Sequence, residues 1–167
     1  MNVPLAQAAM PAKTPAAERT AARTHVLRSA PDTIHWGYWD GALEPVLTVD
    51  PADRVVIECV SGNPEWMPPP ARGLEVLPEL QLIHERVKRG SGNHILTGPV
   101  AVRGARAGDV LEVRILDIEL RQDWGYNLFR AYGGTLPDEF PSYRIMHLPL
   151  DRASNTAVLP SGLRVPL

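Results

Sequence analysis

The chain has 167 residues, which is enough for one domain with a sizeable core and too few for two full domains. Its 17 Lys and Arg residues are interspersed among 19 Asp and Glu residues, and the formal net charge of -2 leaves no basic surface for nucleic acid or for anionic lipid. Cys59 is the single cysteine, which excludes an internal disulfide and a zinc site of several thiolates, and favours the reducing cytoplasm. No stretch approaches the roughly 20 apolar residues of a membrane span, so we expect no membrane partner.

The N-terminal part predicts a tail followed by short strands. Residues 1–24 are rich in Ala, Pro and Thr, have no aromatic residue and no periodic apolar face, and predict a flexible tail. We therefore expect the domain to span residues 25–167. An aromatic segment follows at 34–40, and residues 45–49 and 54–60 predict two strands.

One helix and one irregular loop are expected in the middle of the chain. The prolines and the Gly-Asn-Pro turn of residues 61–70 are incompatible with regular structure, and this loop is long enough to cover a site. Residues 78–89 predict a helix with Pro78 in its first turn and Gly90 as its stop.

Residues 94–118 predict a β-hairpin with His94 at its mouth. Leu111, Val113 and Ile115 share one face of an alternating pattern, while Glu112 and Arg114 take the other. The apolar phase then slips, which predicts a bulge at residues 115–116.

The C-terminal part predicts a loop and further strands. Residues 124–143 are expected to form an aromatic, Gly-containing loop, and residues 144–150 and 155–167 predict short strands. Residues 45–58 and 99–113 share a strand, turn and strand pattern, which indicates either an internal repeat or shared hairpin chemistry. The fold class expected is mainly β, a coiled sheet or barrel-like sandwich with one short helix.

Two segments carry candidate polar groups. His35 and Asp40 are five residues apart and could converge on one cation, although two polar residues alone favour the alternative in which His35 caps a turn and the neighbouring tryptophans are core. His94 follows a Ser-Gly-Asn turn and precedes a strand, which makes it the best single candidate for a ligand or general base. Its alternative is a loop histidine bonded to backbone.

The remaining reactive side chains give weaker signals. Cys59 lies in an apolar strand and is expected to be a small buried hydrophobe rather than a nucleophile. Asn63 and Asn93, with the amides near Gly62 and Gly92, could bind a carbonyl oxygen or an oxyanion. His84 is expected to be structural, and His25 and His147 have no supporting neighbours in the sequence.

Five ordered blocks between residue 33 and the last residue resemble the acetamidase/formamidase family. They are His35-Trp-Gly-Tyr-Trp-Asp40, Val60-Ser-Gly-Asn63, His94-Ile-Leu-Thr-Gly-Pro-Val100, Gly104-Ala-Arg-Ala-Gly-Asp-Val-Leu-Glu-Val113 and Asp123-Trp-Gly-Tyr126. The resemblance implies a β-rich fold and hydrolysis of short linear amides such as formamide or acetamide to a carboxylate and ammonia. It also implies a chain about twice as long, so we expect the sequence to represent the N-terminal half of the family domain, truncated or part of a split enzyme.

The resemblance leads to specific assignments. We expect an amidohydrolase assisted by a divalent metal ion, with zinc the ion considered, held by His35, Asp40 and His94. His94 and Asp40 would be catalytic, while Asn63 and Trp36 would bind the small amide substrate. The chain would act as a homo-oligomer or with a missing C-terminal half. The alternative is a non-catalytic β-rich domain that binds a ligand through its tryptophans, or an inactive half of an amidase.

Overall fold

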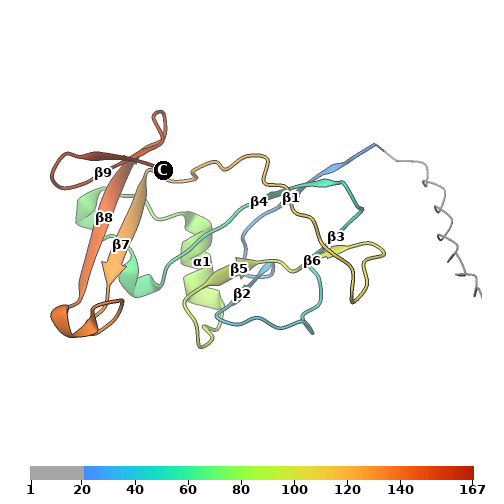
Figure 1. Cartoon of the computed structure of the whole chain (residues 1–167), viewed down its shortest axis with the longest axis horizontal. Coiled ribbons are helices and arrows are strands. Elements are labelled where there is room, and N and C mark those ends of the chain that lie inside the picture. Colours follow the sequence, from blue (N-terminus) through green and yellow to red (C-terminus); the bar gives the residue numbers. More distant parts are fainter. Residues whose placement is uncertain (1–20) are drawn as a thin grey trace, which may run out of the picture.

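The structure is a computed structural model and describes residues 21–167, which are mainly β with one α-helix among them, as the sequence predicts. Figure 1 shows small ladders on one side of the helix and a larger sheet on the other. Most of the expected N-terminal tail lies outside the described residues. Thr24, its last residue, already opens the first strand.

Three two-stranded ladders form the N-terminal part. They are β1 (Thr24–Leu27) with β4 (Arg54–Ile57), parallel; β2 (Ile34–Trp36) with β5 (Ile95–Thr97), antiparallel; and β3 (Leu47–Val49) with β6 (Val100–Val102), parallel. The β3 and β6 strands are the corresponding strands of the repeated sequence pattern, and they pair with each other. Each ladder joins segments that lie at least 30 residues apart, so the pairing depends on tertiary structure.

The C-terminal part is a four-stranded antiparallel sheet with strand order β10-β9-β8-β7. Its strands are β7 (Trp124–Phe129), β8 (Arg144–Asp151), β9 (Thr156–Val158) and β10 (Arg164–Pro166). The strands at β8, β9 and β10 agree with the sequence prediction. The prediction of a loop over residues 124–143 was wrong for its first six residues, because β8 supplies a partner along all of β7 and the ladder buries Trp124.

The helix α1 (Pro78–Arg86) confirms the one helix predicted, although it ends three residues early. Val87 is extended, and its N–H donates to the Ile83 carbonyl at 2.9 Å. Three single 3-10 turns accompany it, each with a proline in its first turn, so the 61–70 loop is less irregular than expected. They are η1 (Pro64–Trp66), η2 (Pro70–Arg72) and η3 (Pro137–Glu139).

The core lies between α1, β2 and the short segment that directly follows β4. Trp36, Val60, Leu80 and Ile83 form one buried cluster, and the Ile83 side chain is fully inaccessible to solvent. The apolar side of α1 therefore covers the end of the β2–β5 ladder, and it fixes the segments on either side of the ladder relative to the helix.

The predicted hairpin over residues 94–118 is absent from the structure. The β5 strand pairs with β2, and β6 pairs with β3, so neither uses the other as a partner. Residues 110–120 form no helix or strand, and every residue from 103 to 119 is exposed. Figure 1 shows this segment as a long trace between β6 and β7. The alternating sequence has the strand pattern, but no strand among the described residues lies beside it.

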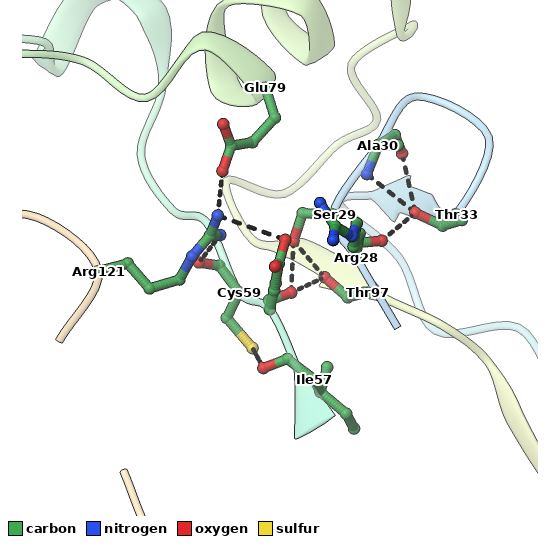
Figure 2. A network of polar contacts seen from close by, with 10 residues as sticks. Arg28, Ser29, Ala30, Thr33, Ile57, Cys59, Glu79, Thr97 and Arg121 are labelled. Carbon is green, nitrogen blue, oxygen red and sulfur yellow. Dashed lines mark hydrogen bonds and ion pairs between the residues drawn. The ribbon is translucent and has the colours of Figure 1, made fainter. Parts of the chain in front are cut away.

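Arg121 ends this long segment and ties it to the rest of the molecule. Its guanidinium contacts the Glu79 carboxylate, lies 3.4 Å from that of Glu58, and donates to the Cys59 carbonyl at 3.2 Å (Figure 2). The Cys59 side chain is exposed, so the expectation of a buried cysteine was wrong. Val60 takes the buried position instead, because the chain turns inward one residue later.

Candidate functional site

A cavity of about 560 Å³ opens where the C-terminal sheet meets the segment around η1 and the turn after α1. Three groups of residues line it: Asn63, Glu65 and Trp66 around η1; Arg89, Ser91, Gly92 and Asn93 after α1; and Arg130 and Tyr143 from the connection between β7 and β8. Its walls thus come from three parts of the chain. We call it the Asn63 pocket.

Asn63 is the most unusual polar residue of the pocket. Its side chain is only 1% exposed, and its Oδ1 atom has no hydrogen-bond partner among the described residues. The backbone around it is well ordered by contacts, since the Asn63 carbonyl accepts a hydrogen bond from the Trp66 N–H at 2.9 Å. A buried carbonyl oxygen without a partner costs about 1–3 kcal/mol. Because Asn63 lines the cavity, this unpaired acceptor is the candidate partner for an N–H donor of a ligand.

An ion pair forms the next part of the wall. Arg89 donates through Nη1 to Glu65 at 3.0 Å. Hydrogen bonds to the Glu65 carboxylate from its own backbone N–H, from Arg89 and from the Asn63 side chain hold the pKa of Glu65 below its usual range. Glu65 is therefore ionised at neutral pH and is a weak base. Arg89 retains further N–H donors that could polarise a carbonyl group.

Contacts behind Trp66 join the two parts of the fold that line the pocket. The His147 Nε2–H donates to the Trp66 carbonyl at 2.7 Å, and the Trp66 ring packs against Tyr126 with centroids 5.8 Å apart. The Trp124 indole N–H donates to the Glu75 carbonyl at 2.7 Å. These contacts attach the β7–β8 ladder to the segment around η1, so the pocket walls are held in place.

Two of the three predicted metal ligands lie on one face of the β2–β5 ladder. Trp36 pairs with Ile95 and faces the core, and the Gly37 N–H donates to the His94 carbonyl at 2.9 Å, which places His35 and His94 on the opposite, outer face. His94 is exposed, whereas His35 Nδ1 lies 3.3 Å from the Gly98 carbonyl.

The third predicted ligand does not complete this set. Asp40 is exposed, and its Oδ1 accepts the Ala42 N–H at 2.8 Å as the cap of a turn. Across residues 21–167 no three His, Cys, Asp or Glu side chains are grouped as a metal site would require. The arrangement of His35, Asp40 and His94 therefore does not fit a bound divalent ion by itself, and none of them lines the Asn63 pocket.

Close backbone contacts explain how the turn after α1 reaches the pocket. The Gly90 N–H donates to the Trp36 carbonyl at 3.0 Å, and a Cβ atom at residue 90 would lie 2.3 Å from that oxygen. The Gly92 N–H likewise donates to the Gly37 carbonyl at 3.1 Å, so this N–H is unavailable to an oxyanion. Of the expected oxyanion groups, the Asn63 and Asn93 side chains do line the pocket.

Trp36 is a core residue rather than part of the pocket lining. It is 2% exposed and packs against His84 and the buried cluster. Its predicted role in substrate binding finds no support in this position. Trp66 and Trp124 are also buried, and Trp39 is exposed at 85%. A binding domain built on four exposed tryptophans therefore does not match the structure.

The structure contains two polar clusters that the sequence analysis missed. His25 Nε2 lies 2.8 Å from Asp53 Oδ2, and hydrogen bonds from the Arg23 backbone and from His25 lower the pKa of Asp53 to about 2. Ser29 and Thr97 both donate to the Glu58 carbonyl (Figure 2). Both clusters join β1 to distant strands, and no local spacing signals them. His84 is structural, as expected, and faces the Gly62 carbonyl at 3.0 Å.

Comparison with known proteins agrees with the architecture. The profile of the Acetamidase/Formamidase family matches residues 23–164. A formamidase from Methylophilus methylotrophus is 47% identical over 53 residues, a match that covers 29% of this chain and 13% of the formamidase.

Two solved structures are similar in fold. An acetamidase from Bacillus halodurans gives a TM-score of 0.61 at 26% identity, over 85% of this chain and 42% of its own. A predicted acetamidase/formamidase from Thermoanaerobacter tengcongensis gives 0.65 at 18% identity, over 88% of this chain and 43% of its own. The chain thus spans less than half the length of these relatives. In residues 21–167 no helix is long and apolar enough to cross a membrane.

Proposed function

Because the chain belongs to the acetamidase/formamidase family, we propose that it is an amidohydrolase for short linear amides and that the Asn63 pocket binds the amide group. The reaction converts an amide and water to a carboxylate and ammonium. The observation that carries the proposal is the buried Oδ1 atom of Asn63, which has no partner among the described residues and belongs to a residue that lines the pocket.

The pocket chemistry fits a primary amide. The Asn63 Oδ1 atom would accept an N–H of the substrate, and the free N–H groups of Arg89 would face the substrate carbonyl oxygen. Negative charge develops on that oxygen when water attacks, and a fixed cation stabilises it. Glu65 keeps Arg89 in position through the 3.0 Å ion pair. Acetamide offers both groups on one small molecule.

Activation of the attacking water requires a further group. Glu65 is a weak base, and it is the one carboxylate in the lining of the pocket. Metal assistance stays part of the proposal, with ligands additional to those that residues 21–167 bring together. His94 lies on the outer face of the β2–β5 ladder and outside the lining of the pocket, so proton transfer to the departing nitrogen also requires a group beyond those that line it. The single cysteine supports the cytoplasm as the location.

The first experiment measures ammonia release from formamide and acetamide by the purified chain, with and without a chelator. We expect release that falls at least tenfold in the Asn63→Ala variant and is unchanged in Asn127→Ala, an exposed asparagine of β7. Sensitivity to the chelator would support metal assistance. Equal activity in the two variants would contradict the assignment of the pocket.

A second candidate function follows from the length of the match, since the chain spans 42–43% of its solved relatives. The chain would then bind amides without hydrolysing them, as one wall of a larger site. Trp66 lines the pocket, so quenching of its fluorescence by acetamide would report binding. Binding that is lost in Asn63→Ala, without ammonia release from the folded wild-type chain, would favour this function over hydrolysis.

A further inference from the structure

The segment of residues 110–116 has the pattern of a strand but lacks a partner strand among the described residues. Val110 is 95% exposed, Leu111 69%, Val113 74% and Ile115 77%. Contiguous exposed apolar side chains on a chain with free backbone donors and acceptors form a template for strand pairing. We call these residues the 110–116 segment.

The two charged side chains of this segment already lie on one side of it. The Arg114 Nε–H donates to the Glu112 carboxylate at 2.5 Å. Side chains two residues apart share a face when the backbone is extended. Leu111, Val113 and Ile115 occupy the alternate positions, so the segment presents a wholly apolar face and a second face with a charged centre.

The sequence of the segment is complementary to itself in one antiparallel register. When Val113 lies opposite Val113 of a second copy, Glu112 lies opposite Arg114 and Leu111 lies opposite Ile115. The same register places Val110 opposite Leu116. Each pair except the central Val113 pair occurs twice because the arrangement has twofold symmetry, so both carboxylates meet a guanidinium.

Neighbouring registers lose this complementarity. A register centred on Glu112 or on Arg114 places that charge opposite its own copy, which is destabilising. A shift of one residue places each charge opposite an apolar side chain and exchanges the faces. Parallel pairing in register also brings like charges together. The charge pattern therefore selects the register centred on Val113.

We propose that a second copy of this chain pairs antiparallel with the 110–116 segment, centred on Val113, to form a twofold dimer. The devices that normally protect an exposed strand are absent here, since the segment contains no proline and its two charges are of opposite sign. A ribbon of two strands is stable only marginally by itself, and we expect dissociation in the micromolar range. None of these residues lines the Asn63 pocket, so amide binding does not depend on the dimer.

Sedimentation of the full chain over a concentration series tests the dimer. The variants change which charges lie opposite each other in the register centred on Val113. Glu112→Arg places two Arg pairs across the interface, and Arg114→Glu places two Glu pairs there. We expect each to raise the dissociation constant about tenfold. The double variant Glu112→Arg/Arg114→Glu restores opposite charges, and we expect it to return within about twofold of the wild type.

Hydrogen exchange supplies a second readout at the level of the backbone. Amides of the 110–116 segment should become protected as the concentration rises, and those of the exposed turn at residues 104–108 should not. A monomer at every concentration would overturn the proposal and assign the segment to a strand from the part of the family fold that this chain does not span. Equal dissociation constants for the single and double variants would overturn the register.

Discussion

Replacement of Asn63 by leucine separates binding from stability, because leucine keeps the branched shape of asparagine and removes its polar atoms. In the structure the Asn63 side chain is 1% exposed, and its Oδ1 atom lacks a partner among the described residues. Removal of a buried unsatisfied oxygen returns about 1–3 kcal/mol. Loss of the hydrogen bond from the Asn63 side chain to the ionised Glu65, which is largely exposed, costs about 1 kcal/mol.

The two contributions oppose each other, and the gain is at least as large as the cost. The free energy of unfolding of Asn63→Leu should therefore be unchanged or raised by up to about 2 kcal/mol, whereas most substitutions of buried residues lower it. Amide binding should fall at least tenfold, since a lost hydrogen bond of about 1.4 kcal/mol corresponds to that factor. A residue whose main role is to contact a ligand is expected to show both results, unchanged or higher stability together with weaker binding.

Urea denaturation followed by tryptophan fluorescence measures the stability, and the acetamide titration measures the binding. The matched control is Asn127→Leu, which changes an exposed asparagine and should leave both quantities within about 0.5 kcal/mol of the wild type. A loss of more than about 2 kcal/mol in Asn63→Leu would refute the reasoning, because it would mean that the Oδ1 atom contributes to folding.

Three further predictions concern stability. Ile83→Ala removes three carbons from a fully buried site and should lower the free energy of unfolding by about 3 kcal/mol in urea denaturation. The control Leu82→Ala, on the same helix at a residue that is 38% exposed, should lower it by about 1 kcal/mol. Equal losses would contradict the assignment of the core. The pKa of Asp53 is lowered from 3.8 to about 2, so its contribution to stability is complete above pH 4 and is lost as the pH falls towards 2. The melting temperature of Asp53→Asn should thus be below that of the wild type at pH 6 and converge with it near pH 2, and a constant difference would count against this. Glu79→Gln weakens the contact with Arg121 and should accelerate hydrogen exchange at residues 120–123, while exchange at the residues of the Asn63 pocket stays unchanged. An unchanged exchange rate at residues 120–123 would show that the other contacts of Arg121 hold this segment.

Local chemistry is sufficient for the elements that depend on nearby residues. Pro78 in the first turn and Gly90 as a stop predict α1, and residues 144–150 predict β8. The apolar side predicted for the helix was wrong at Leu82, which is exposed, while Leu80 is buried with Ile83. The helix ends early because the backbone becomes extended at Val87, after the Val87 N–H has donated to the Ile83 carbonyl, and Gly90 as a stop signal does not predict this.

The failed predictions concern pairing. Residues 110–120 alternate as a strand should, but β6 is paired with β3, and no described strand lies next to them. Conversely, Gly125 gives a poor strand signal, yet six consecutive residues of β8 provide the partner that makes β7 a strand. Alternation of apolar and polar side chains indicates that a segment can form a strand, and only the tertiary structure decides whether a partner strand lies beside it.

The candidate site shows the same division. The turns at Gly62 and Gly92 indicate Asn63 and Asn93 as groups that could bind a carbonyl oxygen, and the family follows from blocks spread over residues 35–126. Apart from Glu65 and Trp66, the partners of Asn63 in the pocket lie 26 to 80 positions further along the chain, and no spacing in the sequence relates them.

The sequence by itself determined the mainly β class, the helix and the family, and it named Asn63 among the candidate polar groups, because composition, periodicity and motif order are properties of the chain. The tertiary structure alone decided that Trp36 is core, that His35 and His94 share a face without Asp40, and that Arg89 and Arg130 approach Asn63. Burial and convergence are set by contacts between distant segments, and these form only when the ladders and the helix pack together.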